Sequence, residues 1–144
     1  DAERVTNKTL KELRLYYIEG NDTFNGTTKN DILASGIGDD VIYGNGGNDK
    51  LMGEEGVDII FGGGGNDTIT GGGGDDIIYG SDGLDTAIYS ANYSNYFITP
   101  EDEEGKMIIT DNRIGINDGS DSVYGVEYFE FNDLIVIPEI LGLI

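Results

Sequence analysis

Aspartate is the residue whose type and spacing in this chain point most directly to chemistry. Eight Asp residues follow one another at intervals of nine, without an insertion: Asp22, Asp31, Asp40, Asp49, Asp58, Asp67, Asp76 and Asp85. Carboxylates bind hard cations or act in pairs as acid and base. The regular interval favours a repeated cation site, because a catalytic pair needs no period.

The composition narrows the function further. The chain has 144 residues, with 28 Asp and Glu against eight Lys and Arg, and a formal net charge of −20. This charge repels nucleic acids and anionic lipids and leaves cations as natural partners. The absence of His and Cys excludes Ser-His-Asp triads, thiolate or imidazole zinc sites and disulfides. We therefore expect no catalytic site and no nucleic-acid partner.

No segment has the apolar pattern of a membrane span or an export leader. The longest apolar run, residues 134–137, is far shorter than a transmembrane helix. Residues 1–20 mix charges and lack the apolar block of a signal peptide. Membrane insertion is not expected.

Other residues keep the same period of nine. Glycine stands two residues before every Asp of the series except Asp31, where Lys29 replaces it. Residues 62–70, GGGGNDTIT, and residues 71–79, GGGGDDIIY, show the full pattern. This pattern resembles the repeats-in-toxin (RTX) family, whose nonapeptide is G-G-x-G-x-D-x-U-x with U apolar. We number its positions one to nine, so the Asp is position six.

The apolar residue at position eight argues against a disordered Gly-rich linker, which has no reason to place one two residues after every Asp. The resemblance implies an all-β fold, a parallel β-roll with two nine-residue repeats per turn. We expect one module over residues 1–144, with a lead over 1–17 that could be helical, eight repeats over 18–89 and a β-rich C-terminal cap over 90–144. The expected core residues are Phe24, Leu33, Ile42, Leu51, Ile60, Ile69, Ile78 and Ala87.

In such a roll, repeats 18 residues apart stack at the strand spacing of about 4.8 Å. The Asp residues then form an odd column, Asp22, Asp40, Asp58 and Asp76, and an even column, Asp31, Asp49, Asp67 and Asp85. Carboxylates at that spacing repel one another, and a divalent cation between them reverses the sign. Calcium takes six to eight hard oxygens in adaptable geometry, whereas magnesium requires a tighter octahedron.

The family resemblance also implies the ligands of each calcium ion. The ion lies between two stacked loops, held by carbonyls at positions two and four and the Asp of one loop, and by carbonyls at positions one and three and the Asp of the next. In the even column the two sites are Asn45, Gly47 and Asp49 with Gly62, Gly64 and Asp67, then Gly63, Gly65 and Asp67 with Gly80, Asp82 and Asp85. In the odd column they are Gly36, Gly38 and Asp40 with Gly53, Glu55 and Asp58, then Glu54, Gly56 and Asp58 with Gly71, Gly73 and Asp76.

About four Ca²⁺ sites are expected on this basis, and up to about six in the roll. The two additional pairs, Asp22 with Asp40 and Asp31 with Asp49, have less complete loops. Lys29 replaces a glycine there, and Tyr17 and Ser35 replace the position-one glycine. A positive φ is costly for such residues.

The region after the repeats also resembles the flanking region of RTX proteins. It ends in G-x-D-x-(apolar)-x-G-(apolar)-E-x-x-x-F-x-D, carried here by Gly119, Asp121, Val123, Gly125, Val126, Glu127, Phe131 and Asp133. Residues 96–99, 106–111 and 128–131 have the composition of strands. Such strands would cover the open edges at the end of a roll, and we expect the tyrosines of this region to pack in the cap rather than form a sugar-binding platform.

The outer surface of the roll is expected to be uneven. Side chains that flank each core residue point outward because strand side chains alternate. The odd repeats display Val41, Tyr43, Ile59, Phe61, Ile77 and Tyr79, whereas the even repeats display Lys50, Met52, Thr68 and Thr70. The apolar odd face is expected to be covered by the lead or by the tail.

The expected function is that of a calcium-dependent folding module in a large bacterial protein exported by a type I secretion system. Eight buried apolar side chains stabilise the fold by less than the ordering of the Gly-rich backbone costs, so the repeats are expected to be unfolded without calcium. Folding would begin outside the cell, and the partners are calcium and the secretion machinery. The alternative is an extracellular binding module, either an adhesin or a polysaccharide-binding unit such as those attached to alginate epimerases.

Overall fold

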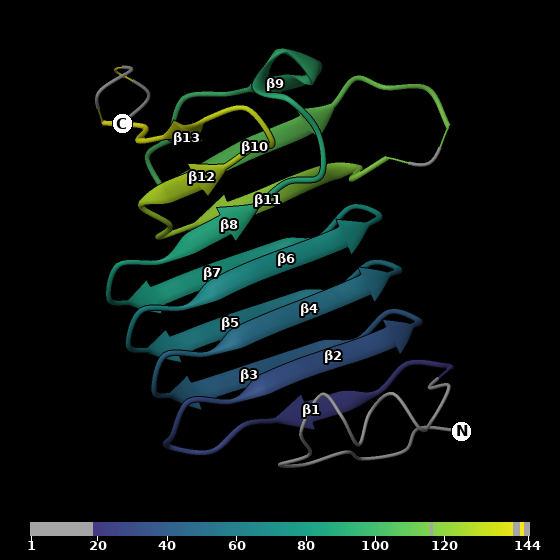
Figure 1. The fold of residues 1–144 in the computed structure, drawn as a ribbon, viewed down its shortest axis with the longest axis vertical. Helices are drawn as coiled ribbons and strands as arrows, with labels where there is room; N and C mark the ends of the chain where they lie inside the picture. Colours follow the sequence, from purple (N-terminus) through teal and green to yellow (C-terminus); the bar gives the residue numbers. More distant parts are fainter. Residues whose placement is uncertain (1–18, 116, 140–141, 143–144) are drawn as a thin grey trace.

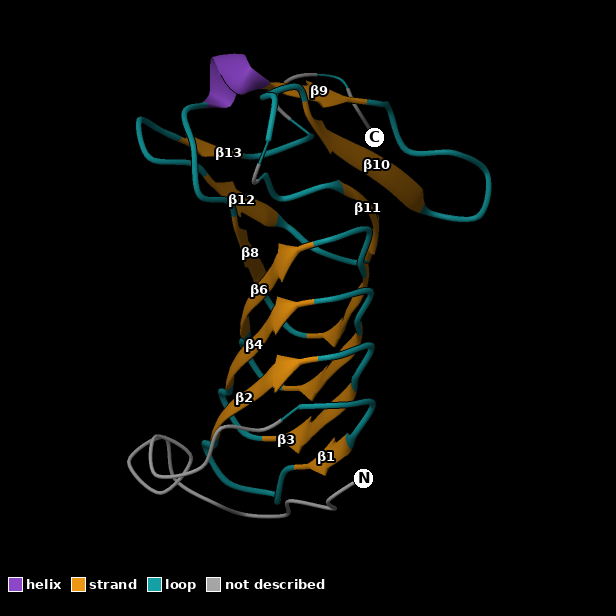
Figure 2. Cartoon of the chain, turned by 90° about the vertical axis from the view of Figure 1, so that its right-hand side faces the viewer, coloured by secondary structure: helices purple, strands orange, loops and turns teal. Residues whose placement is uncertain are grey.

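The computed structural model describes residues 19–115, 117–139 and 142. Its strands form two facing sheets that wind into a roll (Figure 1). The first sheet has the order β1 (Thr23–Asn25), β3 (Val41–Gly46), β5 (Ile59–Gly64), β7 (Ile77–Asp82), β11 (Ser120–Tyr124), β10 (Lys106–Asp111) and β9 (Tyr96–Ile98). The second has the order β13 (Ile135–Val136), β12 (Tyr128–Glu130), β8 (Thr86–Ile88), β6 (Thr68–Gly73), β4 (Lys50–Glu55) and β2 (Ile32–Ile37). Figure 2 shows the stacked turns from the side.

The repeats form the parallel β-roll expected from the sequence. Each strand pairs in parallel with the strand two further along the chain, as in Ile42 with Ile60 and Ile60 with Ile78. Partners are therefore 18 residues apart, and two nine-residue repeats make one turn. The prediction of an all-β roll is confirmed. The prediction that the lead could be helical concerns residues outside those described.

One apolar side chain per repeat fills the space between the two sheets. All eight expected core residues are at most 1% exposed. Their neighbours on each side are less buried, as in the alternating pattern of β5 and β6, because strand side chains alternate between faces. The core of the roll is therefore a single stack of aliphatic side chains ending in Phe24 and Phe129.

Glycine at position four turns the chain between the two sheets. Gly38, Gly56 and Gly74 all have positive φ, between 128° and 142°, a region that other residues rarely adopt. A Cβ there would also clash with the backbone of the loop one turn below, as at Gly56 over Gly38. The repeat therefore requires glycine at this position for two independent reasons.

The tail continues the roll as well as capping it. β11 pairs in parallel with β7, and β12 pairs in parallel with β8. Between β8 and β11 the chain makes an excursion through the 3₁₀ turn Tyr93–Asn95, β9 and β10, and these two strands add to the sheet in antiparallel orientation. The strands expected near residues 96–99, 106–111 and 128–131 are confirmed as β9, β10 and β12. The sequence did not predict β11.

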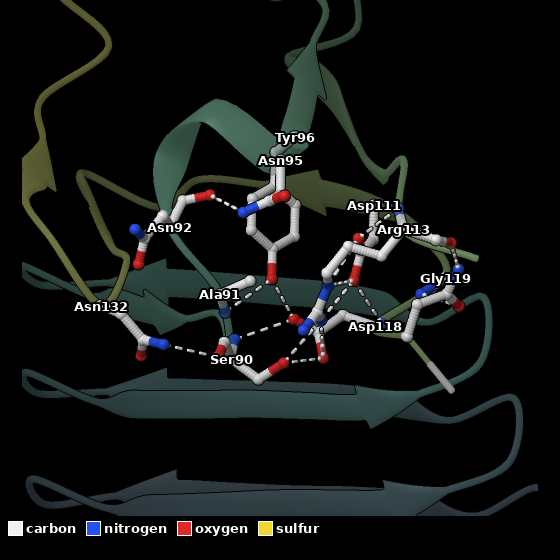
Figure 3. Close-up of polar contacts among 11 residues, drawn as sticks. Ser90, Ala91, Asn92, Asn95, Tyr96, Asp111, Arg113, Asp118, Gly119 and Asn132 are labelled. Atoms are coloured by element: carbon white, nitrogen blue, oxygen red, sulfur yellow. Dashed lines mark hydrogen bonds and ion pairs between the residues drawn. The ribbon is translucent and has the colours of Figure 1, made fainter. Parts of the chain in front are cut away.

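A polar network fastens the excursion to the last repeat (Figure 3). The Tyr96 hydroxyl donates to Asp118 Oδ2, and Ser90 donates to the same carboxylate through its amide and its hydroxyl at 2.8 and 2.7 Å. The Arg113 guanidinium donates to both oxygens of Asp111, whose Oδ2 also accepts the amide of Asp118 at 2.9 Å. These contacts hold the loop before β11 against the end of β8.

The apolar odd face carries a ladder of stacked rings. Tyr43, Phe61, Tyr79 and Tyr124 stack with centroids 4.7–5.0 Å apart, and Tyr43 is 37% exposed. The described part of the tail extends this sheet at its edge through β11. Covering by the lead remains a prediction, because residues 1–17 lie outside the described ranges.

No helix among the residues the structure describes is long and apolar enough to cross a membrane.

Candidate metal centres

The position-six Asp residues form the two expected columns, and hydrogen bonds connect them. The amide of each of the first six Asp residues donates to Oδ1 of the Asp 18 residues later, as from Asp49 to Asp67 and from Asp67 to Asp85, both at 2.8 Å. The odd column shows the same contacts, from Asp40 to Asp58 and from Asp58 to Asp76. Oδ1 therefore fixes each carboxylate in the stack.

The second oxygen of these carboxylates has no such role. Oδ2 is buried and accepts no hydrogen bond in six repeats, those of Asp40, Asp49, Asp58, Asp67, Asp76 and Asp85. None of these residues is more than 2% exposed. A buried carboxylate oxygen without a partner is costly. A row of them in register indicates a repeated ligand rather than a local defect.

At Gly44, Gly53, Gly62 and Gly80, the unpartnered Oδ2 of the same repeat and a carbonyl oxygen of the next turn both lie close to the position that a Cβ would take. A Cβ built on Gly62 would lie 2.6 Å from Asp67 Oδ2 and 2.6 Å from the carbonyl oxygen of Gly80. The same pair of oxygen types surrounds Gly44, where they belong to Asp49 and Gly62. Only glycine leaves this space open. Asp49 with Gly62 and Asp67 with Gly80 are pairs that the sequence assigned to common sites.

The pKa values of buried carboxylates are raised in both columns. Burial raises the pKa of Asp58 to about 7; the amide of Asp40 opposes this shift, while the charges of Asp76 and Asp40 add to it. Burial likewise raises the pKa of Asp49, Asp76 and Asp85 to about 6. Without a cation, burial and mutual repulsion disfavour the ionised form of these carboxylates in the folded state.

The oxygen set fits calcium. Among the described residues, no group of three or more acidic side chains converges on one point, so a site must combine carboxylates with backbone carbonyls, as Ca²⁺ readily accepts. Carbonyls at position three accept one hydrogen bond, as Gly64 does from the Gly47 amide at 2.9 Å, which leaves a lone pair for an ion. The loops offer only hard oxygens.

The N-terminal end of each column is less complete. Asp31 Oδ2 accepts hydrogen bonds from the Thr27 amide at 2.6 Å and the Thr27 hydroxyl at 2.9 Å. In the odd column the Ser35 hydroxyl donates to the carbonyl of Gly53 at 2.7 Å, although Asp40 Oδ2 stays without a partner. Side chains thus take over part of the role that an ion would have.

Sequence reasoning missed a second ladder at position five. Asn48 Oδ1 accepts the amide of Asn66 at 2.8 Å, and Asn66 Oδ1 accepts the amide of Leu84 at 3.0 Å. The odd repeats show the same contact between Asp39 Oδ1 and the amide of Val57. The signal was available, since Asn or Asp occupies this position in all but two of the eight repeats.

Sequence reasoning also left Asp121 and Glu127 out of the columns. The Asp76 amide donates to Asp121 Oδ1 at 3.0 Å, and the Asp85 amide donates to Glu127 Oε2 at 2.8 Å. The signal was the motif itself, because Gly119, Asp121 and Val123 repeat positions four, six and eight. The excursion before them interrupts the series of repeats, since the next three places of the count hold Ser94, Glu103 and Asn112.

The fold and the oxygen columns define a calcium-binding β-roll, and the comparisons agree. Residues 16–51 and residues 52–87 each match the RTX calcium-binding nonapeptide repeat (4 copies), together half of the chain. The chain belongs to this RTX repeat family.

No curated protein matches the chain. Among solved structures, the chain is similar to the solution structure of the AlgE6R3 subunit from the Azotobacter vinelandii mannuronan C5-epimerase. The sequence identity is 16%, the match covers 76% of this chain and 73% of that one, and the TM-score is 0.32.

Proposed function

We propose that this β-roll is a calcium-triggered folding module in the C-terminal region of an exported bacterial protein. The observation that carries the proposal is the row of six buried Oδ2 atoms without partners, four of which face a carbonyl of the next turn beside a position-one glycine. A calcium ion at each point supplies the missing partner and neutralises the repulsion within the column.

The proposed ligand sets are the four complete sites assigned from the sequence. We rank the sites by how many of their ligand oxygens are free of hydrogen bonds from other side chains. Asp67 serves both even-column sites, and its Oδ2 faces the carbonyl of Gly80. The site of Asp40 and Asp58 ranks lower because Ser35 already donates to the Gly53 carbonyl. The additional pair of Asp31 with Asp49, outside these four, ranks below them all because Thr27 occupies Asp31 Oδ2.

The chain's own residues supply the rest of the mechanism. The amide-to-Oδ1 bonds hold each carboxylate in its column, and the position-one and position-four glycines keep the loops open and turned. Each turn contacts mainly its neighbours, so ordering one turn presents a formed loop to the next. A bound ion adds stability as RT ln(1 + [L]/Kd).

The difference in calcium concentration between the cytosol and the exterior delays folding until the chain has been exported. Extracellular-type sites have Kd values of about 0.1–1 mM, far above cytosolic calcium, so the chain stays unfolded inside and folds outside. The test is export of a reporter fused ahead of this chain, with cytosolic calcium low or raised to millimolar. Retention of the fusion at high calcium supports the role, and equal export under both conditions contradicts it.

The calcium sites themselves are tested by titration calorimetry of the purified chain. We expect about four or more ions per chain with affinities of about 0.1–1 mM. Asp67→Asn should remove more bound calcium than Asp31→Asn, because Asp67 belongs to two complete sites. A wild-type chain that binds no calcium would refute the proposed function.

A second function, a calcium-stabilised binding module for glycans or surfaces, rests on a separate observation. The partly exposed ring ladder of Tyr43, Phe61 and Tyr79 offers an apolar strip on one outer face. Binding to a glycan array with and without calcium separates the two functions. Calcium-dependent glycan binding that Phe61→Ala abolishes would favour the second.

A further inference from the structure

The two Asp columns do not end with the last nonapeptide. The amides of Asp76 and Asp85 donate to Asp121 and Glu127, which lie 45 and 42 residues further along the chain rather than 18. The backbone repeats the same contact, since Ser122 N–H donates to the Asp76 carbonyl just as Ile77 N–H donates to the Asp58 carbonyl. Residues of the tail therefore occupy the places of position six in a further turn.

The odd column has buried carboxylate oxygens at this junction. Asp76 and Asp121 are each 1% exposed. Oδ2 of Asp76 is buried and has no hydrogen-bond partner. Oδ2 of Asp121 is also buried, and the hydroxyl of Tyr89, which is 4% exposed, interacts with this carboxylate. Gly119 stacks on the carbonyl of Gly74 just as Gly74 stacks on that of Gly56. The loop before Asp121 thus reproduces the loops of the repeats.

At the end of the even column, the space between an unpartnered Oδ2 and a carbonyl oxygen lies at Gly80. A Cβ on Gly80 would lie 2.6 Å from Asp85 Oδ2 and would clash with the carbonyl oxygen of Gly125. This is the arrangement found at Gly62, with Gly125 in the place of Gly80. Asp85 is fully buried, and its Oδ2 has no hydrogen-bond partner.

We propose that the tail completes two additional calcium sites, one at the C-terminal end of each column. Asp76 and Asp121 hold one ion, and Asp85, the Gly125 carbonyl and Glu127 hold the other. This inference rests on the proposed calcium function and extends it: the last turn is ligated by a segment outside the repeats, so docking of β11 and β12 depends on calcium.

Isosteric variants separate a ligand from a hydrogen-bond acceptor. Asp121→Asn and Glu127→Gln keep an oxygen for the amides of Asp76 and Asp85 but replace the charged ligand. Glu130→Gln and Asp133→Asn make the same charge change at exposed positions of the tail. The readout is the number of calcium ions bound at saturation, measured by titration calorimetry on the full chain, with circular dichroism to verify folding.

We expect each tail variant to lose about one bound ion, the double variant about two and the two controls none. Unchanged stoichiometry in Asp121→Asn and Glu127→Gln, with a wild-type chain that binds calcium, would overturn the inference and leave the proposed function standing. A wild-type chain without bound calcium would refute both.

A second measurement needs no variant and covers the case in which a variant fails to fold. Crystals of the calcium-loaded chain should show anomalous scattering from an ion beside Asp76 and Asp121 and from another beside Asp85 and Gly125. Peaks in the repeats without peaks at these two points would contradict the proposal.

Discussion

Each position-six Asp from Asp40 to Asp85 divides its two oxygens between two tasks. Oδ1 accepts the amide of the Asp one turn earlier, and Oδ2 faces the next turn without a partner. Asn would preserve the first contact but would present an NH₂ group where a cation should bind. Replacing Asp by Asn therefore tests the ligand role with little disturbance of the ladder.

Asp67→Asn should raise the calcium midpoint for folding by about tenfold or more, equivalent to ~1.4 kcal/mol, because Asp67 serves two complete sites. Asp31→Asn should change the midpoint much less, since Thr27 already satisfies its Oδ2. The midpoints are measured by circular dichroism at one protein concentration. Equal midpoints would contradict the ranking of the sites.

The position-five ladder leads to a stabilising substitution. Val57 interrupts this ladder in the odd column, where it is 49% exposed and offers no side-chain oxygen to Asp75. Val57→Asn supplies that oxygen, and its own amide already donates to Asp39. We expect a gain of ~0.5–1.5 kcal/mol in urea unfolding with calcium saturating, and no gain from Val57→Ala. A loss of stability in Val57→Asn would contradict this account of the ladder.

Among the elements, the excursion before β11 depends on an ion pair between the buried carboxylate of Asp111 and the partly exposed guanidinium of Arg113. Burial alone would raise the pKa of Asp111, but hydrogen bonds from Arg113 and from the Asp118 amide hold it at about 2. The ordinary Asp pKa is about 3.9, so this carboxylate stabilises the folded state above that pH. Its contribution is lost as the pH falls towards 2.

Arg113→Met should therefore lower the free energy of unfolding by about 2 kcal/mol at pH 7. The difference between variant and wild type should shrink below pH 4, as Asp111 becomes protonated in both. Urea unfolding at several pH values with calcium saturating provides the measurement. A difference that stays constant down to pH 2 would show that the ion pair does not stabilise the excursion.

The stacked rings give the odd sheet a stabilising element that the even sheet lacks. Phe61 stacks between Tyr43 and Tyr79 with centroids 5.0 and 4.9 Å away. Phe61→Asp removes both contacts, each worth ~0.5–1.5 kcal/mol, so we expect a loss of about 1–3 kcal/mol. Thr70→Asp on the opposite sheet is the control and should be nearly neutral. Similar calcium-loaded melting temperatures would contradict a stabilising role for the ladder.

The elements differ in how far the sequence predicts them. The repeats were predictable in detail because a strict period of nine fixes which residues stack, so the pairing of Ile42 with Ile60 follows from counting alone. β11 was not predictable in this way, because the excursion through β9 and β10 interrupts the series of repeats. Its partner β7 is recognised only in three dimensions, where Asp121 meets Asp76.

The candidate calcium sites were likewise predictable only in part from the sequence. The two columns and the pairs Asp49 with Gly62 and Asp67 with Gly80 followed from the repeat. The occupation of Asp31 by Thr27 and the contact of Ser35 with Gly53 depend on rotamers and local backbone, which the spacing of residues does not specify. The recurrence of Asn and Asp at position five could be read from the sequence, but the hydrogen bonds that join these residues into a ladder could not.

At the scale of the whole molecule, the fold combines a thin core with a high charge. One apolar side chain per repeat separates the sheets, while the chain carries a net charge of −20. The Gly-rich backbone is expensive to order, and the buried carboxylates oppose the folded state unless a cation accompanies them. We therefore expect calcium to determine whether the repeats fold.

The most direct test of this claim is circular dichroism of the chain titrated with calcium from excess chelator. We predict a disordered spectrum in chelator and a cooperative change to a β-rich spectrum at about 0.1–1 mM calcium, with no such change at equal magnesium, which fits these sites less well. A β-rich spectrum in chelator that calcium leaves unchanged would contradict the account.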